Sequence, residues 1–541
     1  MALWSLKGRP ILVVDDFPEM RSMLRAMVAA YGADRVDQAR NGAEAIERLE
    51  RCRYDIVLCD YNLGQGKDGQ QVLEEAKHRN ILPYSSVFIM VTAENTSGMV
   101  MGALEYQPDA YLSKPVTKTV LQARLLKLLE KKETFRGICR ALTAGDRVQA
   151  IRECDALLEA GSRYRFELSK LKADLLIETG DYDRAEALLQ AVLEERELPW
   201  AALGLGKIHY FRKDYEAAAT LFEGIIQANP SFVAAYDWLA RVQADTGRTE
   251  EAQQSLLAAV QCSPKSVPRQ RALGEVAERN GEQELCEQAR RRVVSIGRGS
   301  VLRRPDDHSA LARTLVERGA AREALKVVDN MRHEFKNDPA ADFEAAVMGA
   351  RVHGALGQGE RAAEALDKAL AALRERPDLV SETAATELLA QCLEADRAED
   401  ADQVLRGLIR NGHEDEGLMD RVADIYRAAG QGERVEALIA AAAEEVAEIN
   451  NRGVRLAQAG ELEASSRHFA EAVREMPGNP VVNLNAAQSL IMLMKERGVT
   501  EEGLAEAMGY IRAAESAPHH SQWANKLRNI CQSMARRAKA G

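Results

Sequence analysis

The segment Ile11–Asp16 reads ILVVDD, a run of four apolar residues that ends in two aspartates. Short apolar runs bounded by turn residues are typical of buried parallel strands. Similar runs occur at 55–59 and 87–91, with weaker ones at 35–39 and 110–112. Between the runs, apolar residues recur every three or four positions, as on the buried face of a helix. This alternation predicts a doubly wound α/β domain with a five-stranded parallel sheet, whose crevice lies at the carboxyl ends of the strands.

Polar side chains stand at the ends of these expected strands. Asp15 and Asp16 follow the first, Asp60 ends the third, Thr92 ends the fourth and Lys114 closes the fifth. We expect these side chains to share one crevice. Neighbouring carboxylates repel one another unless they share a cation, and Mg²⁺ takes a few carboxylate oxygens and retains waters. A carboxylate beside Mg²⁺ can attack a phosphoryl group, whose charge the ammonium and hydroxyl groups would balance.

This arrangement resembles the receiver domain of bacterial two-component response regulators. The resemblance covers residues 9–130 and includes the ending Tyr111-Leu112-Ser113-Lys114-Pro115. It implies a flavodoxin-like fold in which Asp60 is the phosphoacceptor. Thr92 and Lys114 would contact the phosphoryl group, and catalysis would extend only to the domain's own phosphorylation and dephosphorylation.

The resemblance also implies a set of ligands for Mg²⁺. Asp16, Asp60 and the backbone carbonyl of Asn62 would bind the ion, and Asp15 would act through a water molecule. Tyr111 would be the aromatic residue that swings inward on activation, together with Thr92 as the second part of the switch.

The loop after Asp60 departs from the usual receiver pattern. Residues 61–69 read YNLGQGKDG, rich in glycine, without proline and longer than usual. This segment also matches the dinucleotide-binding pattern G-x-G-x-x-G, but it lies directly behind Asp60, and a glycine-rich connector explains it. In receivers, the side chains two positions after the acceptor and two after the threonine flank the water that attacks the aspartyl phosphate. Here they are Asn62 and Glu94, which favour fast self-dephosphorylation.

From about Lys132 onward the strand-like runs disappear, and a repeated pattern of two helical segments takes their place. In each unit a residue breaks the chain, and in most units a small residue follows five positions later. Successive breaks lie 30 to 39 residues apart, a period that indicates a solenoid of helical hairpins. The breaks fall at Gly145, Gly180, Lys213, Gly247, Gly281, Gly319, Gly357, Asp396, Gly430, Gly460 and Gly498.

The clearest of these units resemble tetratricopeptide repeats. One unit carries, in order, Leu205, Gly206, Tyr215, Ala218, Phe222 and Pro230. Small residues let the helices of a hairpin approach, larger ones fill the gap, and the proline ends the second helix. We expect a receiver domain over 1–130, a helical linker and start of the array over 131–145, and an all-α solenoid in two parts, 146–298 and 299–541.

Composition narrows the function classes. Among 541 residues, 72 basic and 83 acidic side chains give a net charge of −11, which disfavours a nucleic-acid partner. The eight cysteines form no C-x-x-C pair, so reduced thiols in a cytoplasmic protein are expected instead of disulfides or a zinc site. No apolar stretch reaches 18 residues, which argues against membrane insertion.

The two halves together suggest a response regulator whose output is protein–protein interaction. Helical solenoids present concave surfaces that bind peptides or helices of partner proteins. The expected partners are a sensor histidine kinase or phosphotransfer protein, and a protein that binds the repeat groove. Two alternatives stay open: a phosphate sink that drains a kinase, and an enzyme with an unrecognised site in the array.

Overall fold

The computed structural model describes residues 5–93, 108–377, 380–412, 414–514 and 520–540. The chain divides into two compact units, Met1–Asp307 and His308–Gly541. The first unit holds an α/β domain and a series of helices, and the described part of the second unit is helical. Within the described residues, no helix is both long and apolar enough to cross a membrane.

The α/β domain is built on a parallel sheet of five strands in the order β2-β1-β3-β4-β5. The strands are β1 (Pro10–Val14), β2 (Arg35–Ala39), β3 (Ile56–Asp60), β4 (Val87–Thr92) and β5 (Ala110–Ser113). The predicted doubly wound five-stranded sheet is therefore confirmed.

Strand β3 begins one residue later than the expected 55–59 and includes the aspartate at its end. Asp60 still pairs with Val91 of β4, and Thr92 pairs with Ser113 of β5. Because these pairs continue the ladder to the last residue of each strand, the carboxyl ends of the central strands form one edge.

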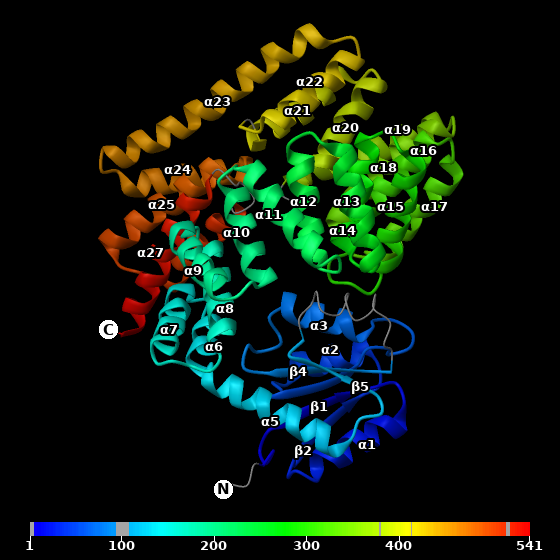
Figure 1. Ribbon diagram of the computed structural model, residues 1–541. Coiled ribbons are helices and arrows are strands. Elements are labelled where there is room, and N and C mark those ends of the chain that lie inside the picture. Colours follow the sequence, from blue (N-terminus) through cyan, green and yellow to red (C-terminus); the bar gives the residue numbers. More distant parts are fainter. Residues whose placement is uncertain (1–4, 94–107, 378–379, 413, 515–519, 541) are drawn as a thin grey trace. The chain divides into compact units, whose positions relative to one another are not determined.

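Helices cover both faces of the sheet (Figure 1). On one face, α1 (Pro18–Ala29) and α5 (Lys118–Thr134) pack on alternate strand residues such as Ile11 and Val13. On the other face, the intervening residues face α2 (Gly42–Arg51) and α3 (Gly69–His78). The apolar runs reflect burial on both faces, as expected for a central parallel strand.

A capping box fixes the start of α3. The Asp68 side chain accepts a hydrogen bond from the Gln71 N–H at 2.9 Å. In return, Gln71 Oε1 accepts one from the Asp68 N–H at 3.1 Å. Two backbone N–H groups at the helix start thus find partners, which fixes where the loop after β3 ends.

The array begins directly after the α/β domain. Phe135 alone separates α5 from α6, and the Lys132 ammonium donates to the Tyr84 carbonyl at 2.9 Å. The helices of the first unit are α6 (Arg136–Thr143), α7 (Arg147–Glu159), α8 (Arg165–Glu178), α9 (Tyr182–Glu195), α10 (Pro199–Phe211), α11 (Tyr215–Ala228), α12 (Val233–Asp245), α13 (Thr249–Cys262), α14 (Val267–Arg279) and α15 (Gln283–Gly297).

The second unit continues the helical pattern. Its helices are α16 (Pro305–Glu317), α17 (Ala321–Glu334), α18 (Pro339–Ala355), α19 (Gly359–Glu375), α20 (Glu382–Glu394), α21 (Ala398–Gly412), α22 (Glu416–Ala428), α23 (Gly432–Gln458), α24 (Leu462–Glu475), α25 (Pro480–Arg497), α26 (Glu501–Ala513) and α27 (Ser521–Ala540). Together with the helices of the first unit, they confirm the predicted all-α array.

The expected breaks coincide with a common backbone conformation. All eleven break positions have a positive φ, between 57° and 105°. Glycine adopts this conformation without strain, which accounts for its predominance. Lys213 and Asp396 are the two breaks that adopt it with a side chain. The regular turn conformation makes each break the corner between two helices.

Candidate functional site

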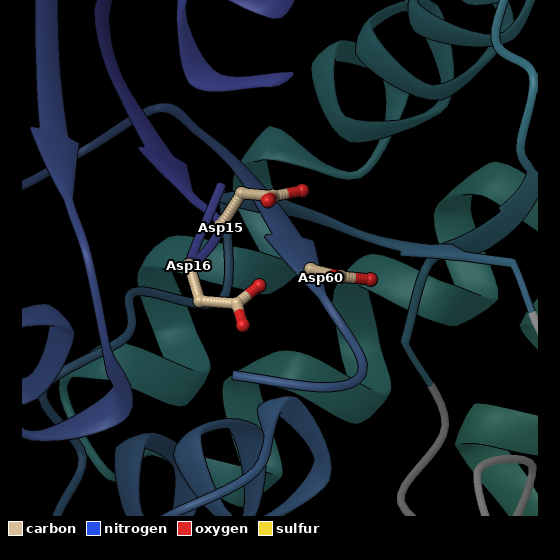
Figure 2. A group of neighbouring side chains, drawn as sticks. All are labelled: Asp15, Asp16 and Asp60. Atoms are coloured by element: carbon tan, nitrogen blue, oxygen red, sulfur yellow. The ribbon is translucent and has the colours of Figure 1, made fainter. Parts of the chain in front are cut away.

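Three carboxylates gather at the carboxyl edge of the sheet. Asp15 and Asp16 follow β1, and Asp60 ends the neighbouring strand β3 (Figure 2). One oxygen from each lies within 4.8 Å of the others. Asp15 is 0% exposed and Asp60 is 5% exposed, while Asp16 is half-buried. Such closely spaced, buried negative charges require compensation.

Lys114 supplies part of this compensation. Its Nζ lies 2.9 Å from Asp15 Oδ2 and 2.8 Å from Asp60 Oδ2, so one ammonium bridges two carboxylates. Burial raises the pKa of the Asp60 carboxyl above its ordinary value, although Lys114 opposes this effect. Burial alone would lower the pKa of Lys114, but its bonds to both aspartates raise that pKa on balance.

Asp16 leaves one oxygen of the cluster uncompensated. Its Oδ1 is buried and has no hydrogen-bond partner within the described part of the chain. By contrast, Asp15 Oδ1 accepts from the Phe17 N–H at 2.9 Å. Arg21 donates to the backbone carbonyls of Asp15 and Asp16, at 2.7 and 3.1 Å, and so fixes the turn after β1. Three carboxylates with an unpartnered buried oxygen fit a hard divalent cation such as Mg²⁺.

The loop after Asp60 is closed tightly at its base. The Tyr61 N–H donates to the Val91 carbonyl at 3.0 Å, and the Gly69 N–H donates to the Tyr61 carbonyl at 2.8 Å. A Cβ at Gly69 would lie 2.1 Å from the Asp60 carbonyl oxygen, so a side chain has no room there. Asn62 lies exposed in this loop, and its Oδ1 accepts from the Gly64 N–H at 3.2 Å.

The remaining sequence-predicted residues lie at strand ends or outside the described residues. Thr92 ends β4, and its carbonyl accepts from the Lys114 N–H at 2.7 Å, which places the two residues on adjacent strand ends. Tyr111 in β5 has a buried Oη without a hydrogen-bond partner in the described segments, and burial raises its pKa. Glu94 lies outside the described residues.

Direct contacts thus join some of the predicted residues and not others. Lys114 bonds to both Asp15 and Asp60, and Asp16 lies beside these two carboxylates. Arg21, which donates to the carbonyls behind the cluster, was not among the residues predicted from the sequence. Its position on α1, one turn after the aspartate pair, was the only local signal.

Comparisons with known proteins find relatives for both parts of the chain. A response regulator receiver domain model matches residues 11–126, and two tetratricopeptide repeat models match residues 170–231 and 212–275. Chemotaxis protein CheY-3 of Vibrio cholerae serotype O1 is 29% identical over 125 residues, which are 23% of this chain and 95% of the relative. Chemotaxis protein CheY of Pseudomonas aeruginosa is 29% identical over 121 residues, covering 22% and 96%.

A solved structure of a CheY-like response regulator receiver domain protein from Methanospirillum hungatei is 25% identical. It covers 23% of this chain and 96% of its own, with a TM-score of 0.21. The two chemotaxis relatives each cover less than a quarter of this chain, 23% and 22%. The chain carries a receiver domain of the bacterial two-component response regulators, followed by a helical array that contains tetratricopeptide repeats.

Proposed function

We propose that this protein is a phosphorylation-controlled response regulator that accepts a phosphoryl group on Asp60 and acts through protein–protein interaction. The observation that carries the proposal is the cluster of Asp15, Asp16 and Asp60 with Lys114 bridging two of its members. The donor would be a sensor histidine kinase or a phosphotransfer protein. In the reaction an Asp60 oxygen attacks phosphorus while the bond to the donor nitrogen breaks.

Each residue of the cluster has a distinct part in this proposal. Lys114 is bonded to Asp60 Oδ2, so it holds the carboxylate in one orientation and would meet the incoming phosphoryl oxygens. Asp16 and Asp60, with the Asn62 carbonyl, would hold Mg²⁺, and Asp15 would act through water. When bound, the ion would supply positive charge that offsets the negative charge of the carboxylates and of the phosphoryl group. Thr92 and Tyr111 would change conformation when Asp60 is phosphorylated and so transmit the signal.

Labelling with acetyl phosphate tests the acceptor. We expect the wild type to be labelled only with Mg²⁺ present, and Asp60→Asn to remain unlabelled. Asp55→Asn is the matched control, because Asp55 precedes the same strand at its opposite end and is partly exposed. Label that persists in Asp60→Asn, or in excess chelator, contradicts the proposal.

The array would provide the output. Stacked helical hairpins present an extended surface for partner proteins, and the receiver leads into the array with a single residue between α5 and α6. Affinity capture with wild type and Asp60→Asn, each with acetyl phosphate, tests this part. We expect the captured proteins to differ between the two. Identical capture would instead support a phosphate sink without a gated output.

We further propose that Asn62 and Glu94 set the lifetime of the phosphorylated state. An amide and a carboxylate can both align the water that attacks the aspartyl phosphate. We expect Asn62→Met to lengthen the lifetime about threefold or more by excluding this water. Gln65→Met, an exposed position in the same loop, is the control. Equal decay of both variants would contradict a role for Asn62.

A further inference from the structure

A turn of the array contacts the loop beside the phosphorylation site. Lys265 lies between α13 and α14 in the first unit. Its Nζ is 3.4 Å from Tyr61 Oη and 3.4 Å from Asp68 Oδ2. The same ammonium lies 5.2 Å from the centre of the Tyr61 ring, within the range of a cation–π interaction. One lysine therefore bridges the first and the next-to-last residue of the loop over 61–69.

A second turn of the array contacts the same face of the receiver. The turn after α15 accepts a hydrogen bond from Lys67 Nζ at the Gly299 carbonyl, at 3.1 Å. The Ile296 carbonyl accepts one from Gln71 Nε2 at 3.2 Å. Ser300 Oγ donates to Glu74 Oε2 at 2.6 Å, and both residues are buried. The contact thus extends from the loop onto α3.

The position of this contact matters because the loop connects directly to the acceptor. Tyr61 follows Asp60, and Asp68 caps α3, so Lys265 touches the loop at both points where it leaves regular structure. The Gly69 N–H to Tyr61 carbonyl bond closes the same base from inside the receiver. A restraint from the array therefore reduces the freedom of the segment that carries Asn62.

We propose that α3 and the loop over 61–68 form the docking surface for the array, and that Lys265 is a positioning residue for the Asp60 site. Holding the loop in place lowers the entropy lost when the site assembles around the phosphoryl group. Coupling of this kind is reciprocal, so phosphorylation of Asp60 also changes how firmly the array is held. The positioning role of Lys265 rests on the proposed function, whereas the docking of the array on α3 and the loop does not.

Hydrogen exchange of the full chain, without phosphodonor, tests the docking. We expect Lys265→Met to speed exchange in peptides covering 61–71 about tenfold, because local opening no longer has to break the lysine contacts. Lys265→Arg should retain most of the protection, since it keeps the charge. Lys336→Met, at an exposed lysine between α17 and α18, is the control. Wild-type exchange in Lys265→Met overturns the proposal.

A pair of glycines gives a second, independent variant. A Cβ at Gly299 would lie 2.4 Å from Gln71 Oε1, and moving that amide breaks its bonds to Asp68 and Ile296. A Cβ at Gly297 would meet only Arg303 Cβ at 3.7 Å, an ordinary contact. We expect Gly299→Ala to speed exchange over 61–71 and Gly297→Ala to leave it unchanged. Equal exchange in the two variants contradicts the proposed docking.

Phosphorylation kinetics test the positioning role. We expect Lys265→Met to slow labelling by acetyl phosphate about threefold and to raise the Mg²⁺ concentration needed for half-maximal rate, with Lys265→Arg close to wild type. Unchanged rate and Mg²⁺ dependence in Lys265→Met overturn this role. A wild type that takes no label at all refutes the proposed function instead, and the exchange measurements still decide the docking.

Discussion

The receiver and the array both place a glycine where another group comes close, but the group differs. In the receiver, a Cβ at Gly69 would lie 2.1 Å from the carbonyl oxygen of Asp60, part of the backbone. In the array, a Cβ at Gly206 would lie 2.4 Å from the Phe222 ring, and one at Gly453 lies 2.4 Å from the Phe469 ring. The receiver glycine makes room for the backbone next to Asp60, whereas both units of the array pair a glycine with a buried phenylalanine ring.

This difference indicates where each region tolerates change. A backbone atom is fixed by the sheet, so the receiver cannot adjust to a side chain at Gly69. A buried ring can shift within its layer, at the cost of the contacts it makes. We therefore expect the array to depend on its buried aromatics and the receiver on a few residues around Asp60.

The largest expected effect is the loss of a buried ring from the array. Phe222 is 0% exposed, whereas Phe211 on the preceding helix is 42% exposed. We expect Phe222→Ala to destabilise the surrounding hairpins by about 4 kcal/mol, because the cavity adds to the lost burial. Phe469→Ala should act similarly on the second unit. Hydrogen exchange of α10–α12 and α23–α25 measures each effect locally, since a chain with two units need not unfold in one transition.

Phe211→Ala provides the control for the ring. Its exposed side chain stacks on Tyr182 at 5.8 Å between ring centroids, so we expect a cost of about 1 kcal/mol or less. If Phe211→Ala proved as costly as Phe222→Ala, burial would not be what distinguishes the two positions.

The next largest effect should come from the receiver glycine. We expect Gly69→Ala to destabilise the receiver by about 3 kcal/mol, because the new Cβ meets a backbone oxygen that cannot move without disturbing β3. Exchange in peptides covering β3 and β4 measures this cost. Gly224→Ala, where a Cβ would meet nothing within 4 Å, is the matched substitution without a clash. Equal receiver protection in both variants would contradict the close approach.

The sequence was sufficient for the features that depend on local pattern. The run at 35–39 became β2 with the same bounds, although it is only weakly apolar. The break positions could be identified because glycine, which adopts the left-handed conformation without strain, stands at nine of the eleven helix corners. Such signals lie within a few residues of the feature that they specify, so they can be recognised in a single sequence.

Other features had no local signal. Lys265 reaches Tyr61 and Asp68 from a distant turn, and nothing around Lys265 distinguishes it from other turn lysines. The cluster of Asp15, Asp16 and Asp60 could be predicted from the sequence because the ends of neighbouring parallel strands lie at the same edge of a sheet. The contact between Lys265 and the receiver depends instead on the path of the chain through helices α6 to α15. That path is the sum of the packing angles between successive helices, which no single sequence motif specifies.

A smaller effect should come from the array glycines. We expect Gly206→Ala to cost about 2 kcal/mol, because the Phe222 ring has to move, and Gly453→Ala to cost a similar amount. Gly224→Ala should instead stabilise α11 by up to about 1 kcal/mol, the helix preference of alanine over glycine. Exchange of the respective hairpins measures both. In a Phe222→Leu background the cost of Gly206→Ala should fall; an unchanged cost would mean that the ring is not what the Cβ meets.

The smallest effect should be a gain in stability from removing the charge of Asp60. The pKa of Asp60 is raised in the folded protein by burial, against an ordinary value of 3.8. A group whose pKa is higher in the folded chain than in the unfolded chain stabilises the fold fully at pH values below its unfolded-state pKa. This stabilisation is lost as the pH rises through the folded-state pKa. At neutral pH the ionised Asp60 therefore weakens the receiver relative to a neutral side chain. In chelator we expect Asp60→Asn to gain about 1 kcal/mol at pH 7.

The pH dependence separates this electrostatic origin from a packing effect. Well below pH 3.8 the wild-type carboxyl is protonated in both folded and unfolded chains, so the advantage of Asp60→Asn should vanish there. Comparing β4 exchange of variant and wild type at each pH cancels the intrinsic rate. Asp55→Asn, at the partly exposed residue just before the same strand, should show no such gain. If the advantage of Asp60→Asn did not depend on pH, packing and not charge would be its cause. The stability of the receiver around Asp60 would then depend on side-chain packing, as that of the array does.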